Sequence, residues 1–307
     1  NKVDKNKKMS NGYLDIARQG ENNWWRYLLG TIIIAFFWLV IGSIVLAIFI
    51  FSPSINNGLN PSDFLRKPSI PGYLIINLQF IFFLLGIFLA IKWLHKRPFL
   101  TLVSADAAIK WQRFFQGFAV WFLIQSILFG IAYILDPSNL EFTFKPVQWF
   151  ILLACAVILT PIQTSTEELF FRGYILQGFG LITKQPLILM MINGVLFMLP
   201  HLANPEVERG FLWMALYYFS FGVFCSFLTL KDNRLELAFA VHAANNLFII
   251  LFVSAEDSAI RVPSLWLLKD TGSPESTLLW FLIKCALFYL IVFGLGRRKK
   301  IGVGSEE

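Results

Sequence analysis

Two adjacent carboxylates and one guanidinium interrupt a stretch of sequence that is otherwise almost entirely apolar. Glu167 and Glu168 follow the apolar run 149–159, and Arg172 comes four residues after Glu168. An ionisable group at membrane depth costs about 3 kcal/mol unless it is paired or faces a wet cavity. A chain that keeps three such groups together in apolar sequence is expected to use them.

The spacing inside this acidic motif predicts two different environments for its carboxylates. Glu168 and Arg172 are four residues apart, so on a helix they lie on one face and can pair. Glu167 is rotated from Glu168 by about 100° and points elsewhere. One carboxylate can then be held ionised while the other is tuned as a general base. The alternative is an ordinary surface ion pair at the cytoplasmic end of a helix.

Two of the three histidines of the chain also lie within apolar segments. His201 ends one such run next to Pro200, which can kink or terminate a helix. Phe197, four residues earlier, shares the helical face of His201. A single intramembrane histidine is more often a packing residue than a catalyst, so His201 gains weight only together with the other motifs.

The second of these histidines, His242, is four residues before Asn246, so the two side chains share a helical face. Two hydrogen-bond donors directed at one point suit an oxyanion hole, which stabilises charge developing at a tetrahedral centre. The competing interpretation is an interhelical hydrogen bond that stabilises the bundle. Asn245, which faces about 100° away, is the better candidate for that second role.

A geometric argument indicates that the three motifs meet. Glu167 and His201 lie equally far along the chain from Lys184, so an antiparallel helical hairpin with its tip there places them at one level. His242 lies only about six residues into its helix, roughly 9 Å at helical rise. The hairpin tip must therefore extend past the membrane surface or lie along it. A bend there is favoured by Gly173, Gly178 and Gly180.

The composition identifies the class of protein whose helices carry these motifs. Of the 307 residues, 57% are hydrophobic and only 15% are charged, whereas a soluble domain has about 25% charged residues. We therefore expect an all-α polytopic membrane protein of about eight transmembrane helices with a buried polar site. The net charge of +7 is explained by placement relative to the bilayer, and no nucleic acid is expected as a partner.

The apolar runs predict the organisation of the chain in order. The expected helices cover about 25–51, 72–94, 112–135, 147–166, 186–201, 210–230, 236–254 and 278–296. The fourth is allowed to continue through Arg172 to Gly173. The expected regions are a cytoplasmic tail (1–24), three N-terminal helices (25–135), a catalytic core of helices four to seven (136–255), and a final loop, helix and basic tail (256–307).

Several smaller features complete the expectation. Most lysines and arginines fall on one side if both termini are cytoplasmic, and a bacterial plasma membrane is the expected location. Lys284 is expected to lie near the outer end of the last helix and to snorkel. No cleavable signal peptide is evident. The cysteines are expected to be packing residues, not disulfides or metal ligands: Cys155, Cys225 and Cys285.

The three motifs together resemble a known family. Glu-Glu-x-x-x-Arg, then Phe-x-x-x-His, then His-x-x-x-Asn, in this order on three apolar helices, is similar to the CPBP family of intramembrane proteases. These are the CAAX-prenyl-protease and bacteriocin-processing (Abi) proteins. The run EELFFRGYILQ at 167–177 resembles the best-preserved stretch of that family, and the resemblance covers about 145–255.

The resemblance implies a role for each motif residue. Glu167 would be the general base that activates water, assisted by His201, and His242 with Asn246 would form the oxyanion hole. The other three would support this set by holding the motif or shaping the His201 helix: Glu168, Arg172 and Phe197. The reaction would be hydrolysis of a peptide bond within the bilayer or at its cytosolic edge.

Metal use is left open by the residues themselves. Glu167, His201 and His242 would make a His₂Glu zinc set with an open fourth position, and the family is often called a metalloprotease. The chain lacks the two histidines on one helix of His-Glu-x-x-His enzymes, and the resemblance also implies a glutamate-driven mechanism that needs no metal. We expect no required cofactor, with zinc on these three residues as the alternative.

Three functions compete at this point. The first is an intramembrane endopeptidase that acts on a membrane-anchored peptide or protein, prenylated or otherwise lipidated. The second is a non-catalytic immunity or assembly scaffold with the same fold, against which the cost of keeping the polar set in lipid argues. The third is a proton-coupled transporter, which is disfavoured because no paired broken helices appear in the sequence.

Overall fold

The protein is an all-α helical bundle, as the composition predicts. The computed structural model describes residues 12–52 and 68–294, so the extreme N-terminal residues and the basic segment 297–300 lie outside it. Four of its long helices contain a short π-helical stretch (η2, η3, η6 or η8). The described α- and π-helices of the first half of the chain are α1 (Trp24–Ala35), η2 (Phe36–Ile41), α2 (Gly42–Ile50), α5 (Ile70–Leu89), η3 (Ala90–His95) and α6 (Trp111–Leu135). Those of the second half are α7 (Pro146–Glu168), η6 (Leu169–Ile175), α8 (Leu176–Phe179), α9 (Pro186–His201), α10 (Phe211–Asp232), α11 (Glu236–Leu251), α12 (Pro274–Tyr289) and η8 (Leu290–Gly294).

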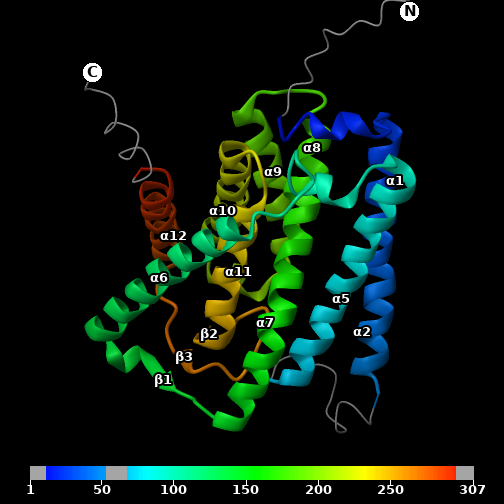
Figure 1. Cartoon of the computed structure of the whole chain (residues 1–307). Coiled ribbons are helices and arrows are strands. Elements are labelled where there is room, and N and C mark those ends of the chain that lie inside the picture. Colours follow the sequence, from blue (N-terminus) through cyan, green and yellow to red (C-terminus); the bar gives the residue numbers. More distant parts are fainter. Residues whose placement is uncertain (1–11, 53–67, 295–307) are drawn as a thin grey trace, which may run out of the picture.

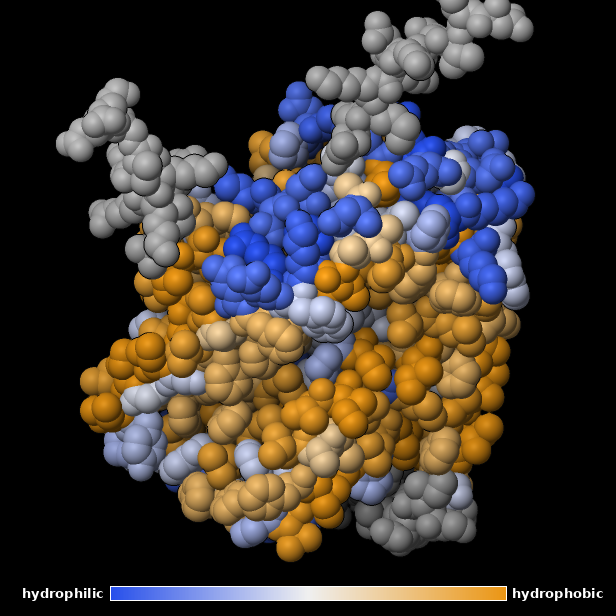
Figure 2. Space-filling model, viewed as in Figure 1, coloured by the Kyte–Doolittle hydropathy of each residue, from blue (hydrophilic) through white to orange (hydrophobic). Residues whose placement is uncertain are grey.

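Six continuous helices are long and apolar enough to cross a bilayer. They are Trp24–Ile50, Ile70–His95, Trp111–Leu135, Pro146–Phe179, Phe211–Asp232 and Pro274–Gly294. Two shorter apolar helices, Pro186–His201 and Glu236–Leu251, complete the predicted set of eight. On the face shown in Figure 2, apolar residues cover most of the surface below a hydrophilic zone. The chain is an integral membrane protein.

The helix ends follow from local chemistry. Ser69 precedes α5 and accepts a hydrogen bond from the Gly72 amide at 3.0 Å, as an N-cap does. Ser273 caps α12 in the same way. Both α7 and α9 begin at a proline, which costs no hydrogen bond at the first helical position. Asn233 ends α10 in the left-handed region, with φ of 59°.

The fourth predicted helix is longer than its expected core of 147–166. It runs unbroken from Pro146 to Phe179 and widens into the π-helical η6 directly after Glu168. The seventh is shorter than expected, because the chain leaves the helix after Leu251 and enters a strand.

A small three-stranded sheet at one end of the bundle was not expected. Its strands are β1 (Leu140–Phe142), β2 (Val253–Ala255) and β3 (Trp266–Leu268), in the order β1-β3-β2. The strand β3 pairs antiparallel with β1 and parallel with β2. The sheet joins the loop between α6 and α7 to the loop between α11 and α12, at the end opposite the first turn of α1 (Figure 1).

Helix α11 forms the centre of the bundle. All of its residues except Asn246 and Ile249 are buried, although it is one of the two short helices. Helices α6, α7 and α10 contact it. A helix that is covered on every side has little freedom to shift, so α11 is a rigid support for any side chain that projects from it.

The expected division of the chain into four regions (1–24, 25–135, 136–255 and 256–307) stays a prediction.

Candidate active site

Arg172 is the centre of the polar cluster inside the bundle. Its side chain and that of Glu168 are both 0% exposed, and Nη1 of Arg172 lies 2.9 Å from Oε1 of Glu168. Its Nη2 donates to the carbonyl oxygen of Gly222 in α10 at 3.2 Å, and its guanidinium carbon lies 4.5 Å from the centre of the Phe197 ring. The predicted pairing of Glu168 with Arg172 is present, but as a fully buried pair and not at a helix surface.

The same carboxylate also holds His242. Oε1 of Glu168 lies 2.7 Å from Nδ1 of His242, and both side chains are buried. An imidazole N–H donates and a carboxylate oxygen accepts, so we assign the proton of this hydrogen bond to Nδ1 of His242. The imidazole is thereby oriented with Nε2 directed away from Glu168. The first and third motifs therefore meet at one oxygen atom.

Glu167 points to a different partner, as its rotation from Glu168 predicts. Its Oε2 atom lies 3.7 Å from Nε2 of His201, and only 9% of its side chain is exposed. Nδ1 of His201 lies 2.7 Å from the carbonyl oxygen of Phe197. We therefore assign the His201 proton to Nδ1, which leaves the lone pair of Nε2 facing Glu167. The hairpin argument placed these two residues at one level, and they are adjacent.

The Phe197 ring lies between these groups. It stacks on His201 with a centroid distance of 4.3 Å and an interplanar angle of 29°. It forms a T-shaped pair with the His242 ring at a centroid distance of 6.0 Å. Tyr218 of α10 lies on another side of His201, at a centroid distance of 4.7 Å. Aromatic rings thus fix the orientation of His201.

Asn245 and Asn246 follow His242 by about one helical turn on α11. Asn245 is 4% exposed, and its Nδ2 donates to Oδ1 of Asn246 at 3.2 Å. Asn246, which is half-buried, therefore uses its oxygen in this contact. Its Nδ2 is the atom that would act as a donor toward a substrate.

Two residues that local patterns did not identify support the acidic motif from outside its helix. Asn193 of α9 donates to the carbonyl oxygen of Phe171 at 2.6 Å. The hydroxyl of Tyr13 lies 3.0 Å from the carbonyl oxygen of Arg172, and burial raises the pKa of Tyr13 far above its usual value. These carbonyls lie in η6, and π-helical turns often occur at functional sites. Asn193 interrupts an apolar run and was detectable on that basis, whereas nothing in the sequence links Tyr13 to this helix.

Helices α9 and α10 approach closely beside the arginine. A Cβ atom on Gly222 would lie 2.8 Å from Cα of Gly194 and 3.0 Å from Cβ of Phe197. Such distances are shorter than contact distances between carbon atoms. Glycine at both positions thus allows the helix that carries His201 to pack on the helix whose carbonyl group binds Arg172.

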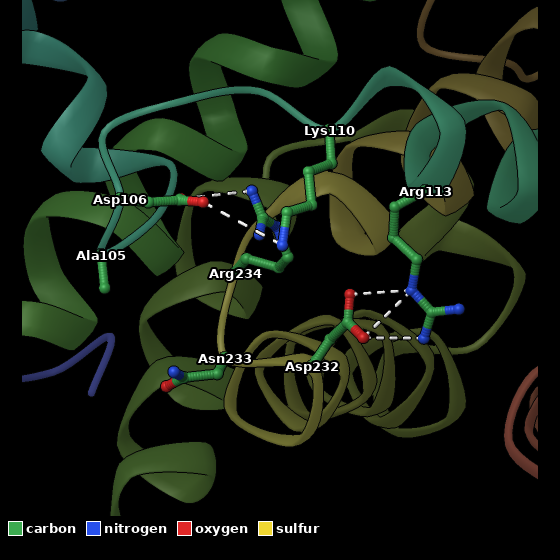
Figure 3. A pocket seen from close by; sticks show the side chains of 7 residues that line it. All are labelled: Ala105, Asp106, Lys110, Arg113, Asp232, Asn233 and Arg234. Atoms are coloured by element: carbon green, nitrogen blue, oxygen red, sulfur yellow. Dashed lines mark hydrogen bonds and ion pairs between the residues drawn. The ribbon is translucent and has the colours of Figure 1, made fainter. Parts of the chain in front are cut away.

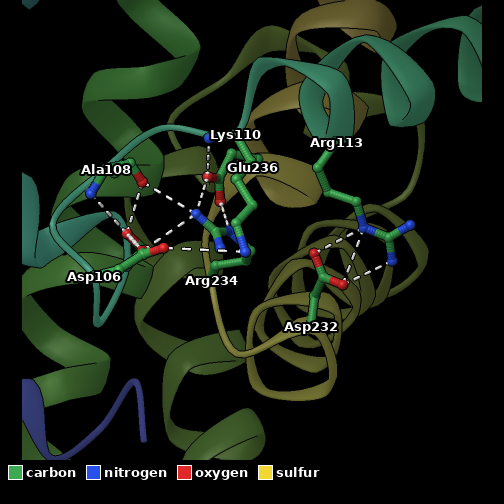
Figure 4. Close-up of polar contacts among 8 residues, drawn as sticks. Asp106, Ala108, Lys110, Arg113, Asp232, Arg234 and Glu236 are labelled. Atoms are coloured by element: carbon green, nitrogen blue, oxygen red, sulfur yellow. Dashed lines mark hydrogen bonds and ion pairs between the residues drawn. The ribbon is translucent and has the colours of Figure 1, made fainter. Parts of the chain in front are cut away.

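A charged network holds the first turn of α11. Glu236 is 0% exposed; it accepts the backbone amide of Lys110 at 2.7 Å and is bound by Arg234 through two hydrogen bonds. Arg234 also contacts Asp106 (Figure 4). Nearby, Arg113 at the start of α6 pairs with Asp232 at the end of α10. A cavity of about 640 Å³ lies beside this network, and its lining is Ala105, Asp106, Lys110, Arg113, Asp232, Asn233 and Arg234 (Figure 3).

The opposite ends of the two short helices are held together as well. Arg209, in the 3-10 turn η7 (Pro205–Arg209) that follows α9, forms two hydrogen bonds with Asp257, which follows β2. Glu206 in the same turn accepts the backbone amide of Ala259 at 2.8 Å. This connection, which we call the loop clamp (Glu206, Arg209, Asp257 and Ala259), fixes the His201 helix relative to the His242 helix.

The depth of the site agrees with the sequence argument. His242 lies six residues beyond Glu236, about 9 Å along α11 from the charged network. Glu167 lies twelve residues, about 18 Å, before the end of α8 at Phe179. The α7–α9 hairpin therefore extends beyond the charged network, with its turn at the top of the bundle (Figure 1).

The zinc alternative does not fit these side chains. Among the residues of 12–52 and 68–294, no three His, Cys, Asp or Glu side chains are arranged to hold a metal ion. The mechanism proposed below uses no metal ion. That no cofactor is required stays a prediction.

Comparison with known proteins identifies the family. Residues 145–248 match the family model described as type II CAAX prenyl endopeptidase Rce1-like. The chain is similar to the uncharacterized protein YyaK of Bacillus subtilis (strain 168), with 35% identity over 255 residues that cover 81% of this chain and 84% of that protein. No solved structure matches the chain. The matched segment contains all seven motif residues.

Proposed function

Since the chain belongs to the Rce1-like family of type II CAAX prenyl endopeptidases, we propose that it is an intramembrane endopeptidase. In this proposal it hydrolyses a peptide bond of a membrane-anchored substrate with a water molecule that Glu167 activates. The observation that carries the proposal is the approach of an imidazole to a buried carboxylate: Nε2 of His201 lies 3.7 Å from Oε2 of Glu167. A second, fully paired carboxylate lies directly beside them.

The geometry of Glu167 and His201 suits the activation of water. With the His201 proton on Nδ1, Nε2 and the Glu167 carboxylate are both hydrogen-bond acceptors. One water molecule can donate one hydrogen to each, which leaves its oxygen lone pair directed at a substrate carbonyl. Glu167 takes one proton as the water oxygen attacks the carbonyl carbon, and it returns that proton to the leaving nitrogen when the tetrahedral intermediate collapses and the C–N bond breaks. His201 orients the water through the hydrogen bond to Nε2.

The oxyanion formed by this attack needs hydrogen-bond donors, and His242 can supply one only in one protonation state. Its Nδ1 proton is used by Glu168, so Nε2 donates only when the ring is the doubly protonated imidazolium. The carboxylate of Glu168, which Arg172 binds, lies 2.7 Å from Nδ1 and would be the counter-ion of that imidazolium. Nδ2 of Asn246, one helical turn away, is proposed as the second donor.

The substrate and location are proposed at a coarser level. The family description names CAAX prenyl endopeptidases, so we propose a prenylated or otherwise lipidated peptide or protein as substrate. The similar protein comes from Bacillus subtilis, which supports a bacterial plasma membrane. Both termini are proposed to be cytoplasmic, because basic residues gather on that side.

The test is cleavage of a quenched-fluorescent peptide library by the purified protein in detergent, with farnesylated and unmodified members. Wild type and Glu167→Gln are compared with and without a zinc chelator. We expect cleavage by the wild type that chelator leaves unchanged and that Glu167→Gln abolishes. Loss of cleavage with chelator and recovery with zinc would replace the metal-free mechanism. A folded wild type that cleaves no member would favour the scaffold function.

A further inference from the structure

Lys284 is a charged side chain for which the proposed reaction has no role. It stands midway between Pro274 and Gly294, the ends of a 21-residue membrane span. Ten residues, about 15 Å of helix, separate it from either end. A lysine stem has four carbons and reaches about 6 Å. The ammonium group is therefore out of reach of lipid headgroups at both ends, and the expectation that Lys284 snorkels from near the outer end is wrong.

The immediate surroundings of Lys284 contain no anion. Its Nζ atom lies 5.4 Å from the centre of the Trp121 ring of α6, and Trp121 is 0% exposed. Within the part of the chain that the structure describes, no carboxylate forms an ion pair with Lys284. A half-buried cation at this depth, with only a ring face as neighbour, is costly to retain.

The helix face around Lys284 is open to the membrane. Helix α12 lies at the edge of the bundle (Figure 1). Trp280, Leu287 and Ile291, one or two turns from Lys284 on its face, are 50%, 38% and 39% exposed. We call these four residues the α12 stripe. Large apolar side chains flanking a single central cation make a surface to which another transmembrane helix can pack.

A second copy of the chain does not supply the missing anion. In the described helices, Glu167 and Glu168 are buried inside the site. The remaining acidic residues of these helices stand at helix ends or in the short turn η7: Asp232, Glu236, Glu275, Glu206 and Glu208. None of them lies at the middle of a membrane span. Among the described residues, a second copy therefore offers no carboxylate at the depth of Lys284, and we take the partner to be a different chain.

We propose that the α12 stripe binds a transmembrane helix of another protein that carries an Asp or Glu at mid-membrane depth, and that Lys284 pairs with this carboxylate. The pairing removes the cost of an isolated cation in lipid. The proposal does not depend on protease activity, because the stripe and the polar site lie on different helices.

The test measures binding of synthetic transmembrane peptides to the full chain in phosphatidylcholine vesicles. Each peptide is a 21-residue Leu/Ala helix with an acceptor dye, and the protein carries a donor at its C-terminus. One peptide has Glu at its centre, one has Gln there, and one has Glu near its end. Energy transfer is followed as the peptide mole fraction increases. We expect the central-Glu peptide to reach half-saturation at about fivefold to thirtyfold lower mole fraction than the central-Gln peptide.

Two variants assign this preference to Lys284. Lys284→Met keeps an unbranched side chain and should abolish the preference, whereas Lys284→Arg should retain it. Lys92→Met is the matched control, since Lys92 lies 5.4 Å over the Phe88 ring but near a helix end, and it should leave the preference intact. Equal binding of the two central peptides to the wild type, or a preference that survives Lys284→Met, would overturn the proposal.

Discussion

At the scale of single residues, one atom, Oε1 of Glu168, joins the parts of the polar site. Oε1 of Glu168 binds both Arg172 and His242, so the acidic motif and His242 are fixed together. The neighbouring carboxylate of Glu167 takes no part in this pairing and is the group that the proposed mechanism uses as its base. In this account, adjacent positions on one helix separate a structural charge from the proposed reactive one.

Removal of Arg172 should destabilise the whole protein. Arg172→Ala leaves Glu168 buried without its cation, and breaking a buried pair in this way costs about 3–5 kcal/mol. We expect a clearly lower thermal unfolding temperature in detergent. Lys184→Ala, which removes a surface ion pair with Asp15 at 2.8 Å, is the control and should change stability by about 1 kcal/mol or less. Equal unfolding temperatures for the two variants would contradict the structural role of Arg172.

These residue contacts were predictable to different degrees. The pairing of Glu168 with Arg172 follows from a spacing of four on a helix, and the meeting of Glu167 with His201 follows from hairpin geometry. The hydrogen bond from Tyr13 to the Arg172 carbonyl joins positions 159 apart in sequence. No local period encodes such a contact, so it emerges only once the bundle is packed.

At the scale of helices, two short elements carry the histidines and depend on their neighbours for position. The α9–α10 contact at Gly194 and Gly222 sets the spacing on one side. The charged network around Glu236 and the loop clamp hold the ends of α11. Sequence periodicity located the helices, but not the sheet, because three-residue strands in a loop leave no alternating pattern long enough to recognise.

Gly222→Ala should separate α9 from α10. The added methyl carbon would lie 2.8 Å from Cα of Gly194. Because Cα is a backbone atom, no rotation of a side chain can relieve this contact. Overpacking of this kind costs about 1–3 kcal/mol, and the shift would weaken the bond from Arg172 to the Gly222 carbonyl. The thermal unfolding temperature and the rate of peptide cleavage should both fall. Gly130→Ala, where no atom lies within 4 Å of the added carbon, serves as the control, and equal effects would refute the close-contact argument.

The loop clamp should make stability depend on pH in a defined direction. The hydrogen bond from Arg209 lowers the pKa of Asp257 below its usual value. A carboxylate with a lowered pKa contributes stability above its unfolded pKa of about 4, and this contribution is lost as the pH falls through the folded value. The difference in unfolding temperature between wild type and Asp257→Asn should therefore be constant from about pH 7 to 5 and shrink below about pH 4. A difference that grows as the pH falls would contradict the assignment.

At the scale of the whole molecule, composition was sufficient to identify a polytopic membrane protein with its helices in the right order. It was not sufficient to set their depths. Helices of 34 and 16 residues lie side by side in this bundle, so equal spans cannot be assumed. The depth of α11 is fixed by the buried charge of Glu236 and its partners, which are distant in sequence.

The proposed orientation can be tested by thiol labelling in intact cells. The first turn of α1 and the end of η8 lie at the same end of the bundle (Figure 1). A cysteine introduced at Glu275 should react with a membrane-impermeant reagent from outside. One introduced at Lys184, at the hairpin turn, should react only after permeabilisation. The reverse pattern would invert the proposed topology.

The most direct test of the central claim is the single-turnover rate constant for peptide cleavage by Glu167→Gln relative to wild type. The amide keeps the size of the carboxylate but cannot take a proton from water. Loss of a general base should lower the rate constant by about 10²- to 10⁴-fold, with an unchanged unfolding temperature and substrate affinity. A variant that cleaves at the wild-type rate would remove Glu167 as the base and contradict the proposed mechanism.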